Sequence, residues 1–167
     1  MRLLKLALFS IVTLFLLITG IGLLFPPEVT VMRSSTFIAP KDSVYALLSD
    51  MRRWPEWLFD STHSLKILTK NSSGKGATAE VGYNKITIVN AQPGVIQTIW
   101  KAPKANDQVC EFQISSNGRA PGVHVMWYFR QHLNWYPWDR IGAVLNEKIL
   151  GPSMDSSFAH LQKRLQQ

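Results

Sequence analysis

The feature that most constrains this chain is an uninterrupted apolar run near its N-terminus. From Leu6 to Phe25 the sequence reads LALFSIVTLFLLITGIGLLF and contains no charged residue. An α-helix needs about 20 apolar residues to cross the hydrocarbon core of a bilayer. Because no polar side marks a solvent-facing surface, a helix inside a soluble core is disfavoured. The run predicts a transmembrane anchor within residues 1–27, followed by a separate domain at residues 28–167.

A cleaved signal peptide is the alternative explanation of this run. The apolar part of a signal peptide is usually about 7–15 residues long and is followed by small residues at the cleavage site. Gly20 and Gly22 could supply such small residues, but the apolar run continues through Leu23, Leu24 and Phe25. This continuation favours an uncleaved anchor.

The charges on either side of the run predict its orientation. Arg2 and Lys5 precede it, whereas Glu28 is the first charged residue after it. Basic flanks stay on the cytoplasmic side of a membrane. We therefore expect a single-pass protein with its N-terminus in the cytoplasm, which in a bacterium puts residues 28–167 on the periplasmic side of the inner membrane.

Composition narrows the classes of function. The chain has 167 residues, of which 46% are hydrophobic, and this suits one globular domain beside the anchor. Its net charge of +7 comes from scattered residues, so we expect a solvated basic surface or weak attraction to anionic headgroups, and no nucleic-acid partner. The single cysteine, Cys110, excludes an internal disulfide and a cysteine-based zinc site. Its apolar-alternating surroundings indicate a buried, inert thiol.

Hydrophobic periodicity predicts the order of the remaining elements. Residues 28–38 are typical of a strand, although Arg33 interrupts the alternation, and residues 41–51 carry apolar side chains on one helical face. About six short runs then follow, with turn residues between them, and predict one antiparallel sheet in meander order. Gly151-Pro152 is expected to open a long terminal helix, with proline at an early position where its missing N–H is not needed. The apolar face of that helix consists of Met154, Phe158, Leu161 and Leu165.

Three stretches of the chain resemble a known superfamily. VMRSSTFIAPKDSVYALLSDMRRWPEW at residues 31–57 matches an opening strand, an Ala-Pro step, a first helix and a Trp-x-x-Trp corner. GVHVMWYFR at residues 122–130 matches a late strand with a central tryptophan, and ILGPSMDSSFAHLQKRL at residues 149–165 matches a Gly-Pro start of the final helix. These features, which cover nearly all of residues 29–167, resemble the START-like, Bet v 1-like superfamily, and within it the polyketide cyclase/dehydrase and lipid-transport group (SRPBCC).

The resemblance implies an α+β helix-grip fold, in which a curved antiparallel sheet surrounds a long C-terminal helix and a hydrophobic cavity lies between them. Members of the group often carry more acidic residues just after the Gly-Pro, where this chain has Ser153 and Met154. The resemblance does not imply a reaction, because one fold can carry many functions.

Trp54 and Trp57 are the first candidate site residues. They either pack in the core between the first helix and the sheet, or wall the mouth of the cavity. Tryptophan also favours the headgroup region of a bilayer, so a mouth that faces the membrane would put Arg52 and Arg53 near lipid phosphates. Strand alternation adds further inward-facing aromatic residues. The cavity candidates are Trp54, Trp57, Phe59, Tyr83, Trp100, Phe112, Trp127 and Phe129.

Sequence motifs of catalysis and metal binding are absent. The chain has no Gly-x-Ser-x-Gly elbow, no His-Glu-x-x-His, no phosphate loop and no paired-cysteine metal site. We therefore expect no cofactor and no metal. His63 follows Asp60 by three residues, but a chance pairing on the surface explains this spacing better than an acid–base pair does.

The preferred interpretation is a membrane-anchored binding module for a lipid or other hydrophobic small molecule, without chemistry of its own. One alternative is a polyketide cyclase/dehydratase-like enzyme, which would need a polar group such as Tyr83 or His63 inside the cavity to move a proton. The other alternative is a cavity-free protein-interaction domain with a filled core.

Overall fold

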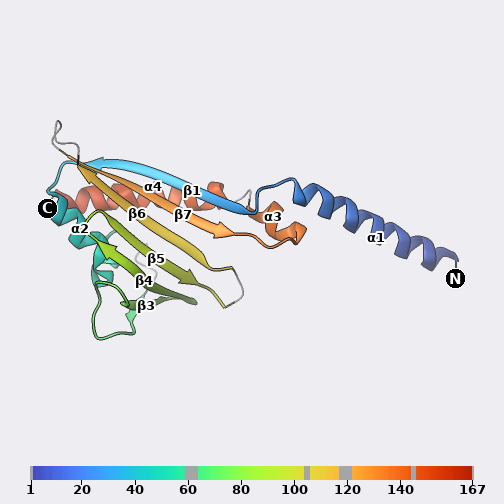
Figure 1. Ribbon diagram of the computed structural model, residues 1–167, viewed down its shortest axis with the longest axis horizontal. Helices are drawn as coiled ribbons and strands as arrows, with labels where there is room; N and C mark the ends of the chain where they lie inside the picture. The colour runs from blue at the N-terminus through green and yellow to red at the C-terminus, as the bar shows by residue number, and fades with distance from the viewer. Residues whose placement is uncertain (1, 59–63, 104–105, 117–121, 144–145, 167) are drawn as a thin grey trace.

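The computed structural model describes residues 2–58, 64–103, 106–116, 122–143 and 146–166 of the chain. It contains an N-terminal helix α1 (Arg2–Leu23), a seven-stranded antiparallel sheet and a long C-terminal helix α4 (Asn146–Leu165). In Figure 1, α1 extends away from the sheet at one end of the molecule, and the C-terminus lies at the opposite end.

Helix α1 coincides with the apolar run. Its 22 residues, at about 1.5 Å of rise each, give a length of about 33 Å, which matches a bilayer core of about 30 Å. Within the described ranges, α1 is the one helix whose length and apolarity suit a bilayer span. The predicted helix is therefore confirmed, whereas its membrane setting and its orientation stay predictions.

The sheet follows the predicted meander, with one addition. Its order is β1-β7-β6-β5-β4-β3-β2, and each neighbouring pair is antiparallel. The first strand therefore pairs with the last one, at the edge opposite β2. The strands are β1 (Glu28–Phe37), β2 (Leu65–Ile67), β3 (Thr78–Val81), β4 (Asn84–Gln92), β5 (Val95–Lys101), β6 (Gln108–Ser116) and β7 (Val123–His132).

One face of the sheet forms the core with three helical elements. The predicted alternation is confirmed in β6 and β7, where Phe112 and Trp127 point into the core and their neighbours along each strand do not. Helix α2 (Lys41–Ser49), the 3-10 helix η1 (Met51–Glu56) and α4 contribute side chains to the same buried cluster. This arrangement of one sheet face against a long terminal helix agrees with the helix-grip fold that the resemblance implied.

Arg33 explains why the alternation of the first strand is interrupted. It shares the inward-facing parity of Val31 and Phe37, but its guanidinium meets α4. The Arg33 Nε atom lies 3.3 Å from Asp155 Oδ2, and Nη1 lies 3.8 Å from Glu147 Oε1. The apparent break in the strand pattern is therefore an ion pair between the sheet and the terminal helix.

The start of α4 differs from the sequence prediction. The helix begins at Asn146, so Gly151-Pro152 lies inside it and does not open it. Pro152 lacks the N–H that would bond to the Lys148 carbonyl, which costs the helix one hydrogen bond. Gly151 has a separate packing role, because a Cβ atom there would collide with the Arg33 guanidinium.

A short helix that the periodicity did not predict lies beside the membrane-length helix. Helix α3 (Pro137–Ala143) follows β7 and packs against the end of α1 nearest the sheet, as Figure 1 shows. Between α1 and β1 the backbone is held at two points. The Leu133 N–H donates to the Pro27 carbonyl at 2.7 Å, and Arg140 Nη1 donates to the Phe25 carbonyl.

Candidate functional site

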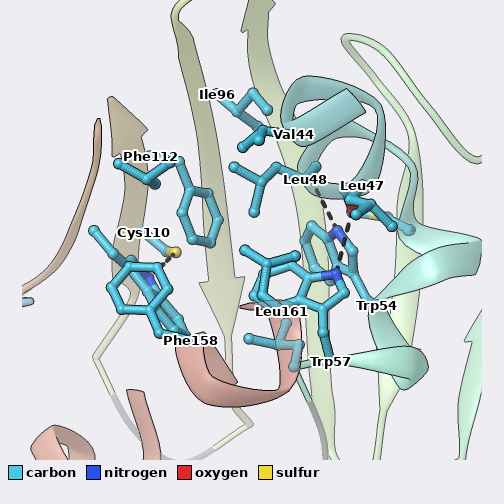
Figure 2. Close-up of a cluster of buried hydrophobic side chains, with 14 of the residues drawn as sticks. Val44, Leu47, Leu48, Trp54, Trp57, Ile96, Cys110, Phe112, Phe158 and Leu161 are labelled. Carbon is cyan, nitrogen blue, oxygen red and sulfur yellow. Dashed lines mark hydrogen bonds between the residues drawn. The ribbon is translucent and has the colours of Figure 1, made fainter. Parts of the chain in front are cut away.

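Trp54 and Trp57 lie in the core and also close the end of a helix. Both side chains are fully buried. Trp54 Nε1 donates to the Leu48 carbonyl at 3.0 Å, and Trp57 Nε1 donates to the Leu47 carbonyl at 3.3 Å (Figure 2). The last four carbonyls of a helix have no partner within it. The two indoles therefore supply donors to the C-terminal turn of α2.

The 3-10 geometry of η1 makes these contacts possible. Asp50 Oδ1 accepts a hydrogen bond from the Arg52 N–H at 3.0 Å, which starts the tight turn directly after α2. Pro55 lies inside η1 and the chain leaves it at Trp57. This turn folds the segment back beneath α2, so both indole N–H groups meet carbonyls that precede them in sequence.

The indole of Trp57 belongs to a group of aromatic rings between the sheet and α4. Its centroid lies 6.0 Å from that of Phe112 and 6.2 Å from that of Trp127, both in edge-to-face geometry. Phe112 and Trp127 are 5.0 Å apart, and Trp127 lies 5.6 Å from Phe158 of α4. Ring pairs attract one another at centroid distances of about 4.5–7 Å. These rings therefore contact each other directly in the region where the resemblance implied a cavity.

A second group of aromatic rings joins η1 to strands β5 and β7. Trp54 stacks on Trp100 at 6.4 Å with an interplanar angle of 10°, and Trp100 meets Phe129 edge-to-face at 5.6 Å. Six of the eight candidates thus lie together in or against one aromatic interior. For Trp54 and Trp57, full burial and hydrogen bonding favour the core-packing interpretation over an exposed wall at a mouth.

One candidate lies outside this interior, and another lies outside the described residues. Tyr83 is 89% exposed, because Gly82 and Tyr83 form the turn between the paired residues Val81 and Asn84. A side chain at such a turn points to solvent, so the prediction that Tyr83 lines a cavity or moves a proton there is wrong. Phe59 lies outside the described residues, as do Asp60 and His63.

The polar atoms of the interior are paired with one another. Trp127 Nε1 donates to Cys110 Sγ at 3.0 Å, Trp100 Nε1 donates to Thr98 Oγ1 at 3.0 Å, and Thr98 Oγ1 donates to the Cys110 carbonyl at 3.4 Å. Burial raises the pKa of the Cys110 thiol from 9.0 to about 12. The predicted burial of Cys110 is confirmed, and because the thiolate is the reactive form, we expect a low reactivity near neutral pH.

A further aromatic group lies outside the core, beside α1. Trp135 and Trp138 are 55% and 62% exposed, and Tyr136 stacks on Trp138 at 5.3 Å with an interplanar angle of 4°. These residues follow the last predicted strand, so strand alternation did not select them. Three aromatic residues within the four positions 135–138 were the available signal.

Two surface pockets adjoin at Trp138. An apolar groove of about 390 Å³ between α1 and α3 is lined by Phe15, Ile18, Pro137 and Trp138. A mainly polar pocket of about 430 Å³ is lined by Pro103, Asn106, Gln131, Asn134, Tyr136, Trp138 and Asp139. Among the residues that the structure describes, no group of three or more His, Cys, Asp or Glu side chains is placed to hold a metal ion.

Comparisons with known proteins define the fold. No protein-family model and no curated protein matches the chain. Solved structures do match it. A START superfamily protein from Mycobacterium smegmatis is 13% identical with a TM-score of 0.63, over 82% of this chain and 97% of that one. A protein from Chromobacterium violaceum is 13% identical with a TM-score of 0.63, over 83% of this chain and 97% of that one. CalU16 from Micromonospora echinospora is 14% identical with a TM-score of 0.55, over 78% of this chain and 80% of that one. The chain has the START-like fold.

Proposed function

We propose that this START-fold chain is a membrane-anchored module that binds a lipid or another hydrophobic small molecule between its sheet and α4, and that it catalyses no reaction on that molecule. One observation carries the proposal. The face of the sheet that meets α4 presents aromatic and aliphatic side chains, and the polar atoms described among them bond to one another. Such a lining suits an apolar ligand, whose transfer from water is favourable.

The same lining argues against acid–base chemistry. Proton transfer in catalysis needs a positioned group with a pKa near the working pH. Among the described residues of the buried core cluster, the titratable side chain is Cys110, and burial raises its pKa to about 12. The polyketide cyclase/dehydratase-like alternative loses Tyr83, which is exposed. We therefore favour binding over catalysis.

Access for a ligand would require α4 to move away from η1, because the rings are in mutual contact. Polar contacts between described residues hold this boundary. Ser157 Oγ of α4 lies 3.1 Å from the Leu58 carbonyl and 2.9 Å from the Ser153 carbonyl, so these two acceptors share its proton. Arg164 Nε donates to Glu56 Oε2 at 2.7 Å. In the proposed mechanism, separation of these partners exposes the aromatic face to a lipid, and the ligand then takes the place of ring–ring contacts.

A second candidate function is a cavity-free interaction domain. The specific observation in its favour is the direct packing of Trp57, Phe112, Trp127 and Phe158 at centroid distances of 5.0–6.2 Å. In that case the aromatic interior serves stability, and partners bind elsewhere on the surface.

A reversible disulfide between α4 and position 58, two residues after η1, distinguishes the two functions. The double variant Leu58→Cys/Ser157→Cys of the full chain, oxidised to a disulfide, should take up much less of an apolar fluorescent probe than its reduced form. Native mass spectrometry should likewise find copurified lipid lost on oxidation. The variants Leu58→Cys and Ser157→Cys, each alone beside the native Cys110, serve as matched controls. No uptake by a folded parent would favour the cavity-free interaction domain, and equal uptake by the oxidised and reduced protein would overturn access between the sheet and α4.

The membrane setting is part of the proposal and has its own test. Arg2 and Lys5 precede α1, and their charges favour a cytoplasmic N-terminus, which would put the START-fold domain in the periplasm of a bacterium. Alkaline phosphatase fused after Gln167 should then be active, because it folds to an active form outside the cytoplasm. An inactive fusion at normal expression would overturn the orientation, and a mature chain starting near Leu23 would overturn the anchor.

A further inference from the structure

Helix α3 is fixed to α1 more closely than an incidental contact requires. A Cβ atom on Gly22 would lie 3.2 Å from the Pro137 Cα atom, so the absence of a side chain at Gly22 permits this approach. The Arg140 side chain is buried and donates to two carbonyls, that of Phe25 just after α1 and that of Asn134 just before α3. We call this contact region of α1 and α3 the α1–α3 junction. The position of α3 against α1 is therefore defined by backbone contact and by hydrogen bonds.

The groove between the two helices lies within the length of α1. Phe15 and Ile18 line it, and they precede Leu23, the last residue of α1, by eight and five positions. At about 1.5 Å per residue, the groove lies about 8–12 Å inside that end. Helices that lie in a bilayer interface bury their apolar face about 5–10 Å deep. An anchor that spans the bilayer would therefore bring Trp138 to the level of the acyl chains.

The surroundings of Trp138 are ordered from apolar to polar. On the side of α1 lie Phe15, Ile18 and Pro137, and on the side of the sheet lies the polar pocket with Asn134 and Asp139. Asp139 Oδ2 accepts from Asn134 Nδ2 at 2.9 Å. Tryptophan and tyrosine favour the boundary between hydrocarbon and headgroups, because one end of each ring system is apolar and the other is polar. The exposed rings of Trp135, Tyr136 and Trp138 fit that boundary better than they fit water.

We propose that the α1–α3 junction is a phospholipid-binding site in the leaflet on the side of the START-fold domain. One acyl chain lies in the groove of Phe15, Ile18, Pro137 and Trp138, and the headgroup contacts the polar pocket that begins at Trp138. The uncharged part of α1 from a second copy, residues 6–23, would hold hydrocarbon against the polar pocket, whereas a phospholipid matches both parts. The inference rests on the proposed membrane anchor and is independent of a ligand between the sheet and α4.

Quenching of tryptophan fluorescence by lipids brominated along the acyl chain tests this site. The full chain is reconstituted into phosphatidylcholine–phosphatidylethanolamine vesicles with and without the brominated lipid. Two of the six tryptophans of the chain lie at the junction, so we expect partial quenching. Trp135→Phe/Trp138→Phe should abolish it, whereas Trp100→Phe, which removes an interior ring, should leave the quenched signal in place.

The outcomes separate this site from the anchor and from other occupants. A chain that remains in carbonate-washed vesicles without any quenching would overturn the lipid site and leave the anchor standing. A chain that washes out of the vesicles would overturn the anchor and the site with it. Quenching that increases as the protein-to-lipid ratio falls would identify a second copy as the occupant and overturn the lipid site. Quenching independent of that ratio, with one phospholipid retained per chain in native mass spectrometry and lost in Trp138→Ala, is the expected result.

Discussion

Two segments of this chain share one pattern and lie in opposite surroundings. Trp54-Pro-Glu-Trp57 and Trp135-Tyr-Pro-Trp138 each have two tryptophans three residues apart with a proline between them. The first pair is fully buried and donates to the end of α2, whereas the second pair is more than half exposed beside α1. The segments differ in what precedes them. The first follows the end of α2, whose last carbonyls have no partner within the helix, and the second follows the end of β7.

Tryptophan content alone does not define a role. A buried tryptophan needs a partner for its N–H and rings around it, and the corner after α2 supplies both. A tryptophan at the boundary of a membrane needs an apolar region on one side and polar groups on the other, and the junction of α1 with α3 supplies these.

Alanine substitutions should separate the segments most strongly. We expect Trp54→Ala and Trp57→Ala each to lower the free energy of unfolding by about 3–5 kcal/mol, because each removes a packed ring. Trp135→Ala and Trp138→Ala should change it by less than about 0.5 kcal/mol in detergent, as is usual for exposed positions. Denaturant titration followed by circular dichroism measures both. A small loss for Trp57→Ala would instead support the wall of an open mouth.

The next effect concerns the close approach at the junction. Gly22→Leu should push α3 away from α1 and lower the stability of their contact by about 1–3 kcal/mol, as overpacking does. Gly20→Leu is the matched control, because a Cβ atom there meets nothing within 4 Å. Hydrogen exchange of the α3 amides should speed up in the first variant and not in the second. Equal exchange rates in both variants would mean that α3 is held independently of α1.

A smaller effect isolates the indole hydrogen bonds. Trp57→Phe keeps an aromatic ring but leaves the Leu47 carbonyl without its donor, so we expect a loss of about 1 kcal/mol in the free energy of unfolding. Trp138→Phe should not measurably change the free energy of unfolding in detergent, because the proposed role of Trp138 does not involve an indole N–H hydrogen bond to a helix carbonyl. If both variants behave alike, the capping of α2 by Trp57 has no energetic value.

The smallest effect near neutral pH concerns the thiol of the interior. Burial raises the pKa of Cys110 from 9.0 to about 12, so the folded state keeps its proton where the unfolded chain loses it. The contribution of Cys110 to stability is constant below pH 9.0 and is lost as the pH rises from there toward 12. The parent should therefore lose more stability above pH 9.0 than Cys110→Ala does. Rapid maleimide labelling of the folded parent at neutral pH would contradict this burial.

The sequence predicted the parts of the fold that depend on local periodicity. The alternation around Phe112 and Trp127 and the helical spacing within α2 correspond directly to buried faces. Arg33 interrupts the alternation of the first strand because it pairs with acidic residues of α4. The pattern of residues 28–38 alone cannot reveal these partners, which lie more than 110 residues later in the sequence. For the same reason, the pairing of β1 with β7 could not be derived from either strand alone.

The candidate site was predicted in part. Parity correctly grouped Trp100, Phe112, Trp127 and Phe129, because each lies on a regular strand. Tyr83 was placed at the end of a strand predicted over residues 77–83, but the chain turns at Gly82-Tyr83, where strand geometry no longer applies. Sequence spacing could not decide whether Trp54 and Trp57 wall a cavity mouth or pack in the core. That choice depends on their distances to Leu47, Leu48 and Phe112, which only the structure gives. The role of α3 escaped prediction because its environment is α1, which is distant in sequence.

The short connection between α1 and β1 limits the travel of the domain. Four residues, 24–27, join the two elements, and even fully extended they would span at most about 14 Å. Bonds from Leu133 and Arg140 to this segment shorten that range further. In the proposed membrane setting, the domain has no flexible linker on which it could move between distant membranes. Its ligands and partners must therefore reach it within one molecular length of the bilayer surface.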